Sequence, residues 1–166
     1  MRRLGVAFGV AVAAMAGCFP DDDGQKDGMV TQDNGGTQEL GPDRQPIIFW
    51  RIKEDDAKAV AALLDAGTPI EITGGFDSTP LIQAAIVNHW DIALLLLERG
   101  ANPLAASRNG MTAPFLAHAS RVQPGGTLYP GLKAFRDALK ARGVDEVIFA
   151  PPIVKTMLAE GRWPPQ

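Results

Sequence analysis

The chain of 166 residues is poor in the side chains that build reactive sites. It has one cysteine, Cys18, and two histidines, His89 and His118. One cysteine cannot form a disulfide within a single chain, so the folded part must be held together by packing. The histidines are far apart in the sequence and have no cysteine between them, which is not the ligand spacing of a zinc site.

The sequence also lacks a basic surface and the common catalytic motifs. From residue 47 to 166, twelve acidic side chains balance twelve basic ones, whereas nucleic-acid binding needs positive charge gathered on one face. Ser78, Ser107 and Ser120 lack the Gly-x-Ser-x-Gly context of a nucleophile elbow. No glycine pair leads into the Lys-Ser/Thr of a phosphate loop. We therefore expect no nucleic-acid partner, no cofactor and no enzymatic activity.

The N-terminal segment has the features of an export signal. Two arginines precede an apolar stretch of 14 residues, 4–17, and a membrane-spanning helix needs about 20. A charged start, a short apolar run and a small-residue end are typical of signal peptides. The last four residues, Met-Ala-Gly-Cys, resemble the lipobox of bacterial lipoproteins. That resemblance implies that residues 1–17 are removed and that Cys18 carries lipid. A signal peptide with an incidental cysteine is the alternative.

Residues 18–46 have the composition of a spacer. From residue 19 to 46, seven acidic side chains face two basic ones, and the only aromatic residue is Phe19. Such a segment cannot bury enough apolar surface to offset the entropy lost on ordering. Its three consecutive aspartates lack the alternating spacing of a calcium loop. We expect a disordered tether with a mean reach of about 30 Å.

The segment after the tether repeats with a period of 33 residues. The pattern Leu63-Leu-Asp-Ala-Gly67 returns as Leu96-Leu-Glu-Arg-Gly100. Between the two copies, Thr79 is a good helix N-cap, and the proline after it suits the first helical position. A second helix ends at Gly100, which can adopt the left-handed cap conformation. This unit, with Thr-Pro-Leu, paired alanines, Asn-His and a leucine-rich second helix, resembles the ankyrin repeat.

The resemblance implies an all-α fold over residues 47–166: an ankyrin-like solenoid of about three to four helix-pair repeats with short hairpin fingers. The caps are degenerate, and the third unit carries an inserted loop at about 122–131. The last unit keeps only a second helix, near 153–161. Each helix pair must bury one face against its neighbour, because a single unit cannot stand alone.

Within the best-matching unit, side-chain size indicates the packing and the turns. Ala85 is small enough for two helices to approach closely, and Ile92, Leu95 and Leu96 lie at helical spacing, as core residues do. The family commonly has Asp-Gly where this chain has Phe76 and Asp77. We therefore expect the first finger to turn elsewhere, at the glycine pair just before them.

Ankyrin-like proteins bind partners through finger tips and the concave side of their first helices. Carried onto this chain, the resemblance selects Phe76 and Asp77 in the first finger, Leu104, Arg108 and Asn109 in the second, His118 on an inner helix and Tyr129 in the inserted loop. Aromatic and arginine side chains dominate binding hot spots. For His118, a partly buried structural role is the interpretation that we favour.

The sequence therefore predicts an exported, lipid-anchored ankyrin-repeat protein that binds a protein partner in the bacterial envelope. An immunity protein that neutralises a secreted toxin is one such role. A scaffold or protective partner of a resident envelope enzyme is the alternative, and an enzyme with a site around His118 is a remote one. The residue after Cys18 is Phe19 rather than the aspartate that retains lipoproteins at the inner membrane of enteric bacteria. We therefore expect anchoring in the outer membrane, facing the periplasm.

Overall fold

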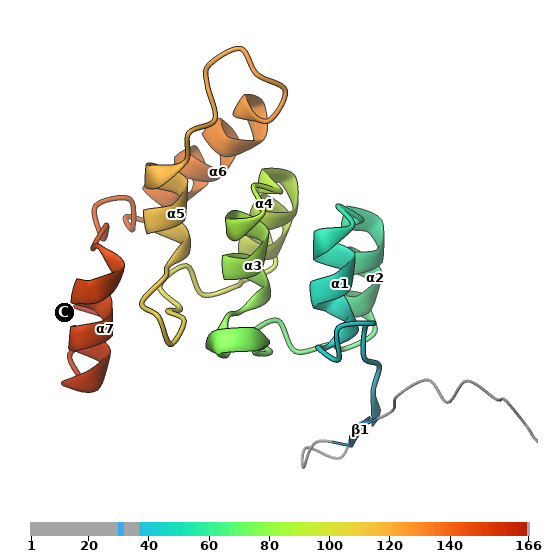
Figure 1. The fold of residues 1–166 in the computed structure, drawn as a ribbon. Helices are drawn as coiled ribbons and strands as arrows, with labels where there is room; N and C mark the ends of the chain where they lie inside the picture. Colours follow the sequence, from blue (N-terminus) through green and yellow to red (C-terminus); the bar gives the residue numbers. More distant parts are fainter. Residues whose placement is uncertain (1–29, 32–36, 166) are drawn as a thin grey trace, which may run out of the picture.

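The fold is a stack of helix pairs. The computed structural model describes residues 30–31 and 37–165, and this part contains seven α-helices and one short two-stranded ribbon (Figure 1). The strands are β1 (Val30–Thr31) and β2 (Thr37–Gln38), which pair antiparallel. The helices are α1 (Ile47–Lys53), α2 (Ala57–Asp65), α3 (Pro80–Ile86), α4 (Trp90–Glu98), α5 (Ala113–Ala119), α6 (Tyr129–Ala141) and α7 (Pro151–Ala159). The prediction of an all-α stack of helix pairs is confirmed, with three pairs followed by α7.

The helices begin and end where the capping residues of the sequence allow. The side chains of Thr79 and Thr112 accept hydrogen bonds from backbone N–H groups in the first turns of α3 and α5. These bonds satisfy donors that have no partner within the helix. Gly67 and Gly100 follow α2 and α4 with φ of 94°, a conformation in which a β-carbon would be strained.

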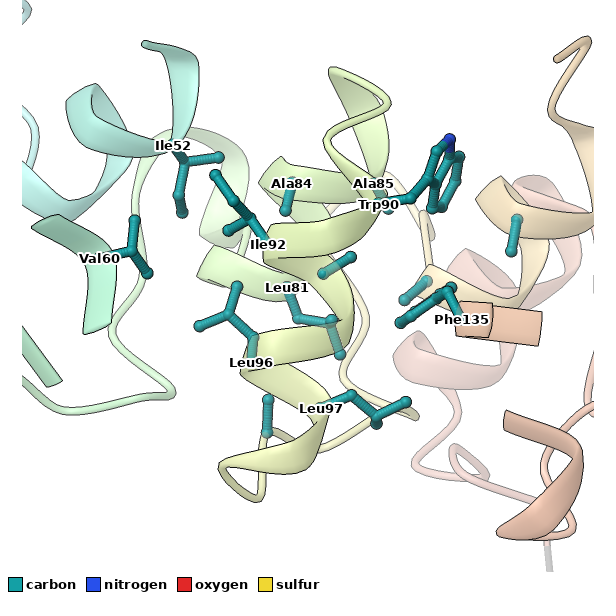
Figure 2. Packing of buried hydrophobic residues seen from close by; sticks show 14 of the residues in the cluster. Ile52, Val60, Leu81, Ala84, Ala85, Trp90, Ile92, Leu96, Leu97 and Phe135 are labelled. Carbon is teal, nitrogen blue, oxygen red and sulfur yellow. The ribbon is translucent and has the colours of Figure 1, made fainter. Parts of the chain in front are cut away.

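The first two pairs share a core of aliphatic side chains. Figure 2 shows Ile52 and Val60 of the first pair facing Ile92 and Leu96 of the second, and all four are fully buried. The predicted core positions Ile92 and Leu96 are therefore confirmed, whereas Leu95 is only half-buried at the edge of this cluster. Burial of such side chains is the main favourable contribution to folding.

The second and third pairs meet through small and aromatic residues. Ala85 is 3% exposed, in agreement with its predicted place at a helix contact. Trp90 of α4 packs on Phe135 of α6 with ring centroids 5.7 Å apart (Figure 2). Among the buried polar side-chain atoms of the described residues, only the indole N–H of Trp90 lacks a hydrogen-bond partner.

The folded part starts earlier than the composition predicts. The backbone N–H of Ile47 donates to the carbonyl of Glu39 at 2.9 Å, and that of Gly41 donates to the carbonyl of Gln45 at 2.8 Å. Gly41 is buried, and a β-carbon there would lie 2.9 Å from the β-carbon of Trp50. Residues 39–46, which we placed in the disordered tether, are thus packed on α1. Residues 1–17 and Cys18 lie outside the described part of the chain.

The C-terminal helix does not continue the row of second helices. α7 begins with two prolines at its first positions. Figure 1 shows it at the end of the stack, beside the loop that precedes α5. A β-carbon on Gly110 in that loop would lie 2.1 Å from the carbonyl oxygen of Pro151. The prediction that α7 is the second helix of a fourth pair is therefore wrong, since it caps the stack across this loop.

Candidate protein-binding site

Two loops project from the same end of the stack (Figure 1). We call residues 68–78, between α2 and α3, finger 1, and residues 101–112, between α4 and α5, finger 2. Finger 2 has one antiparallel bridge, between Ala106 and Thr112. Finger 1 has no bridge among its residues and is shaped instead by turns and a 3₁₀ turn at Gly75–Asp77. Both fingers close like short hairpins, since the N–H of Gly74 donates to the carbonyl of Ser78 and that of Ser107 to the carbonyl of Met111, each at 2.9 Å.

Finger 1 turns at Phe76 and Asp77, not at the preceding glycine pair as we expected. Phe76 has φ 57° and ψ 29°, and Asp77 has φ 56°. The N–H of Ser78 closes the turn on the carbonyl of Gly75 at 3.2 Å. Positive φ at two successive central residues is typical of turns that favour Asn and Gly. A phenylalanine in this conformation is unusual.

The corresponding position of finger 2 has residues that suit a turn, but the turn has a different conformation. Asn109 and Gly110 stand 33 residues after Phe76 and Asp77. Of the two, only Gly110 has a positive φ, at 79°. Finger 1 therefore has two successive residues with positive φ and no glycine at either position, although glycine adopts this conformation at the lowest cost.

The ring of Phe76 projects into solvent. Its residue is 65% exposed, the highest value among the exposed large hydrophobic side chains of the described residues. The others are Ile86, Leu128, Ile153 and Leu158. Single exposed apolar residues are common on protein surfaces. Phe76 differs from these residues because it is exposed and also has a backbone conformation that is unfavourable for phenylalanine.

Arg108 ties finger 2 to finger 1. Its guanidinium donates two hydrogen bonds of 2.9 Å, one to each carboxylate oxygen of Asp77. Its backbone N–H donates to the carbonyl of Phe76 at 2.8 Å. The hydrogen bonds that Arg108 donates to Asp77, together with the negative charge of that carboxylate, raise the pKa of Arg108 above its ordinary value. Arg108, which we expected to face a partner, also holds the neighbouring finger, and its side chain is 67% exposed.

The remaining candidate residues are divided between the two ends of the molecule. Asn109 is exposed beside Arg108, whereas Leu104 is half-buried, and its carbonyl accepts a 2.8 Å hydrogen bond from the indole of Trp163. Tyr129 is half-buried and is the first residue of α6. The loop between α5 and α6 covers residues 120–128, so Tyr129 lies at the start of α6 and not in the loop. Figure 1 places this loop at the end opposite the fingers.

His118 lies on an open face rather than in a structural contact. It is exposed, contrary to the partly buried role that we favoured. It borders a hollow of about 230 Å³ between α5, α6 and the following loop, lined also by Ala117, Arg136, Leu139 and Lys140. Ala85, 33 residues earlier, is covered by the next pair. At His118 no further pair of described helices follows, so the same position stays open.

Sequence analysis missed the other support of finger 1, Gln45. Its side-chain oxygen accepts from the N–H of Gly75 at 2.9 Å, and its amide nitrogen donates to Asp43 at 3.1 Å. Asp43 is in turn paired with Lys53 of α1. The Gly-Pro-Asp sequence before Gln45 is a turn signal. No local pattern indicates that this turn reaches a finger 30 residues away.

Burial and hydrogen bonding act in opposite directions on Asp43. Burial raises the pKa of its carboxyl group, but the hydrogen bonds from Lys53 and from the backbone of Gln45 lower it. The net result is a pKa below the ordinary value. The ionised carboxylate therefore stabilises the segment that supports finger 1.

The surface formed by the fingers presents groups that could contact another molecule. Within the described ranges, no three His, Cys, Asp or Glu side chains converge as a metal site would require. Nor is any helix of residues 37–165 both long and apolar enough to cross a membrane. What the fingers present is an aromatic ring, an exposed amide at Asn109 and a fixed ion pair. These groups suit recognition of another macromolecule.

Comparisons with known proteins agree with this architecture. Residues 76–108 match the family model of the ankyrin repeat, a stretch that runs from the tip of finger 1 into finger 2. No curated protein sequence matches the chain. A similar solved structure is the human ASB11 ankyrin repeat domain, at 17% identity and a TM-score of 0.42. The match covers 70% of this chain and 54% of that one. The family-model match and the three helix pairs confirm the predicted all-α, ankyrin-like fold.

Proposed function

We propose that this chain is a protein-binding module that recognises its partner through fingers 1 and 2. The observation that carries the proposal is the ring of Phe76, which is 65% exposed at the tip of a finger fixed by its neighbour. Ankyrin repeats indicate protein–protein interaction in general, and the matching stretch, 76–108, runs from the tip of finger 1 to Arg108 of finger 2. Aromatic side chains at such positions are frequent hot spots of binding.

We further propose that the module works in the bacterial envelope on a lipid anchor. The support is the N-terminal sequence: two arginines, a short apolar run and a lipobox-like ending at Cys18. The residue after Cys18 is Phe19, which favours delivery to the outer membrane, facing the periplasm. A protein-binding module anchored there could act as an immunity protein, which binds and blocks a toxin that enters the periplasm.

Site-specific photo-crosslinking tests the binding face. The full chain is produced in the source organism with a benzoylphenylalanine at Asn109, which is exposed on finger 2. A matched chain carries the same group at Lys58, which is exposed on α2. We expect one protein adduct from position 109 and none from position 58. An adduct from position 58 alone, or from neither position, would contradict recognition through the fingers.

The identity of the adduct then tests the immunity role. We expect the captured protein to be toxic when it is directed to the periplasm of cells that lack this chain, and harmless when the chain is present. A captured protein that is harmless in both strains would exclude immunity while leaving the binding function intact.

A further inference from the structure

We propose that Phe76 is a preorganised anchor that inserts into an apolar pocket of the partner protein, and that Arg108 and Gln45 are positioning residues that hold it ready. The inference rests on the proposed function, because it specifies how the fingers recognise a partner. It assigns Arg108 and Gln45 a role that acts through Phe76, with no contact of their own to the partner.

The backbone of Phe76 has a conformation that is unfavourable for a phenylalanine without tertiary contacts to hold it. Phe76 and Asp77 both have φ near 57°, at 57° and 56°. A left-handed conformation is strained for a residue with a bulky side chain, and such strain persists only where the surroundings over-determine it. Strained residues of this kind cluster at ligand contacts and switch regions. Burial of the ring within this chain does not compensate for the strain, because the ring is exposed.

Contacts from finger 2 impose the conformation from one side. The backbone N–H of Arg108 donates to the carbonyl of Phe76 at 2.8 Å, and its guanidinium holds both oxygens of Asp77 at 2.9 Å. Arg108 therefore contacts both central residues of the turn, Phe76 through its backbone N–H and Asp77 through its guanidinium. A bidentate contact of this type fixes orientation as well as distance.

The N-terminal segment imposes the conformation from the other side. Gln45 accepts from the N–H of Gly75, and Asp43 orients Gln45. Gly74 packs so closely that a β-carbon there would lie 2.6 Å from the side-chain oxygen of Gln45 and 3.0 Å from the ring of Phe49. The base of the turn thus sits directly on α1 and on residues 43–45.

The two charged side chains of finger 1, Glu71 and Asp77, both have partners in finger 2. Glu71 accepts from the backbone N–H of Asn102 at 2.7 Å, and Asp77 is paired with Arg108. The Asp77–Arg108 pair carries no net charge. The partner chemistry that fits is an apolar pocket with an uncharged rim, because a charged rim would find no free counterpart beside the ring. A fixed backbone also reduces the ordering cost of binding.

The strain can be measured without the partner. In the full chain, Phe76→Gly should melt about 2–4 °C above Phe76→Ala, because only glycine removes the strain while both variants remove the ring. The measurement is thermal unfolding followed by circular dichroism. Equal melting temperatures for the two variants would show that the turn is relaxed, and would overturn the claim of an anchor held under strain.

The positioning role is tested on the partner protein captured through Asn109, by titration calorimetry with the full chain. We expect Phe76→Ala to weaken binding by about 30-fold or more. Arg108→Ala and Gln45→Ala should each weaken binding, but neither should weaken it further in the Phe76→Ala background. The matched control is Arg99→Ala, which removes a comparable ion pair with Asp65 at the ends of α4 and α2. This control should bind as the wild type does.

The outcomes separate the two proposals. If Arg108→Ala and Phe76→Ala are additive in the double variant, Arg108 contacts the partner directly and is not a positioning residue. If a partner is captured at Asn109 but its affinity is unchanged by Phe76→Ala, the anchor is wrong and recognition through the fingers stands. If no partner is captured at Asn109, the proposed function fails, and this inference fails with it.

Discussion

At the scale of single residues, the volume allowed to a side chain decides which substitutions the stack tolerates. Ala85 is 3% exposed in the hydrophobic cluster between helix pairs. A larger side chain there has to displace neighbours that are already closely packed. Ala62 of α2 is also a helical alanine, but its side chain is exposed. The two positions therefore form a natural pair for comparing burial.

Ala85→Glu should destabilise the chain by about 3 kcal/mol or more, because it overpacks a helix contact and buries a charge. Chemical denaturation followed by circular dichroism measures the change. Ala62→Glu is the control, and it should change the free energy of unfolding by less than about 0.5 kcal/mol. Similar unfolding curves for the two variants would mean that α3 is packed through another face.

The ion pair of Asp43 adds a dependence on pH. Its pKa is lowered in the folded state, so its contribution to stability is complete above the ordinary carboxyl pKa. That contribution is lost as the pH falls through the lowered value. Asp43→Asn should therefore cost up to about 1 kcal/mol at pH 7 and progressively less as the pH falls below about 4. Urea titrations of the wild type and Asp43→Asn, at pH 7 and below about pH 4, give the free energies of unfolding. A cost of the substitution that does not change with pH would contradict the ion pair.

At the scale of elements, Gly110 allows the loop of finger 2 to lie directly against the first turn of α7. Gly110 has φ 79°, and a β-carbon there would lie 2.1 Å from the carbonyl oxygen of Pro151 and 3.0 Å from the backbone nitrogen of Lys155. Trp163 adds a second attachment through its 2.8 Å hydrogen bond to Leu104. Because the obstructing atoms are backbone, they cannot move aside without moving the helix.

Gly110→Ala should detach α7 from finger 2, because strain and a backbone clash act together. Gly125→Ala in the insertion is the control: it has a similar φ of 91° but no atom within 4 Å of the added carbon. Strain alone should cost about 1 kcal/mol in both variants. Hydrogen exchange of residues 151–163 should therefore accelerate in Gly110→Ala only. Unchanged exchange in that variant would mean that α7 is held by other contacts.

At the scale of the whole molecule, the features that could be predicted are those encoded locally. Helix starts follow from Thr79 and Thr112, and helix ends from Gly67 and Gly100, because capping depends on a few adjacent residues. The turn of finger 1 could not be predicted in this way. It depends on Arg108, which is 31 residues beyond Asp77 in the sequence.

The same reasoning explains the errors at both ends of the stack. Composition placed residues 39–46 in the tether, yet their contacts are with α1 and finger 1, which a composition average cannot register. His118 was expected to be partly buried, as a structural residue of an inner helix. Its exposure depends on where the helix pairs stop. Tertiary contacts of long sequence separation are what the local patterns leave out.

The lipid anchor gives a prediction for the molecule as a whole. One acyl chain holds a protein on a membrane only marginally, whereas two or more hold it stably. If Cys18 carries lipid on its sulfur and its amine, Cys18→Ser should move the full chain from the membrane fraction to the soluble periplasmic fraction, or leave the signal segment uncleaved. Fractionation and the intact mass of the N-terminal peptide measure both effects. A Cys18→Ser chain that sediments with membranes as before, together with a wild-type N-terminus of unmodified mass, would contradict the anchor. The fingers would then act in a soluble periplasmic protein.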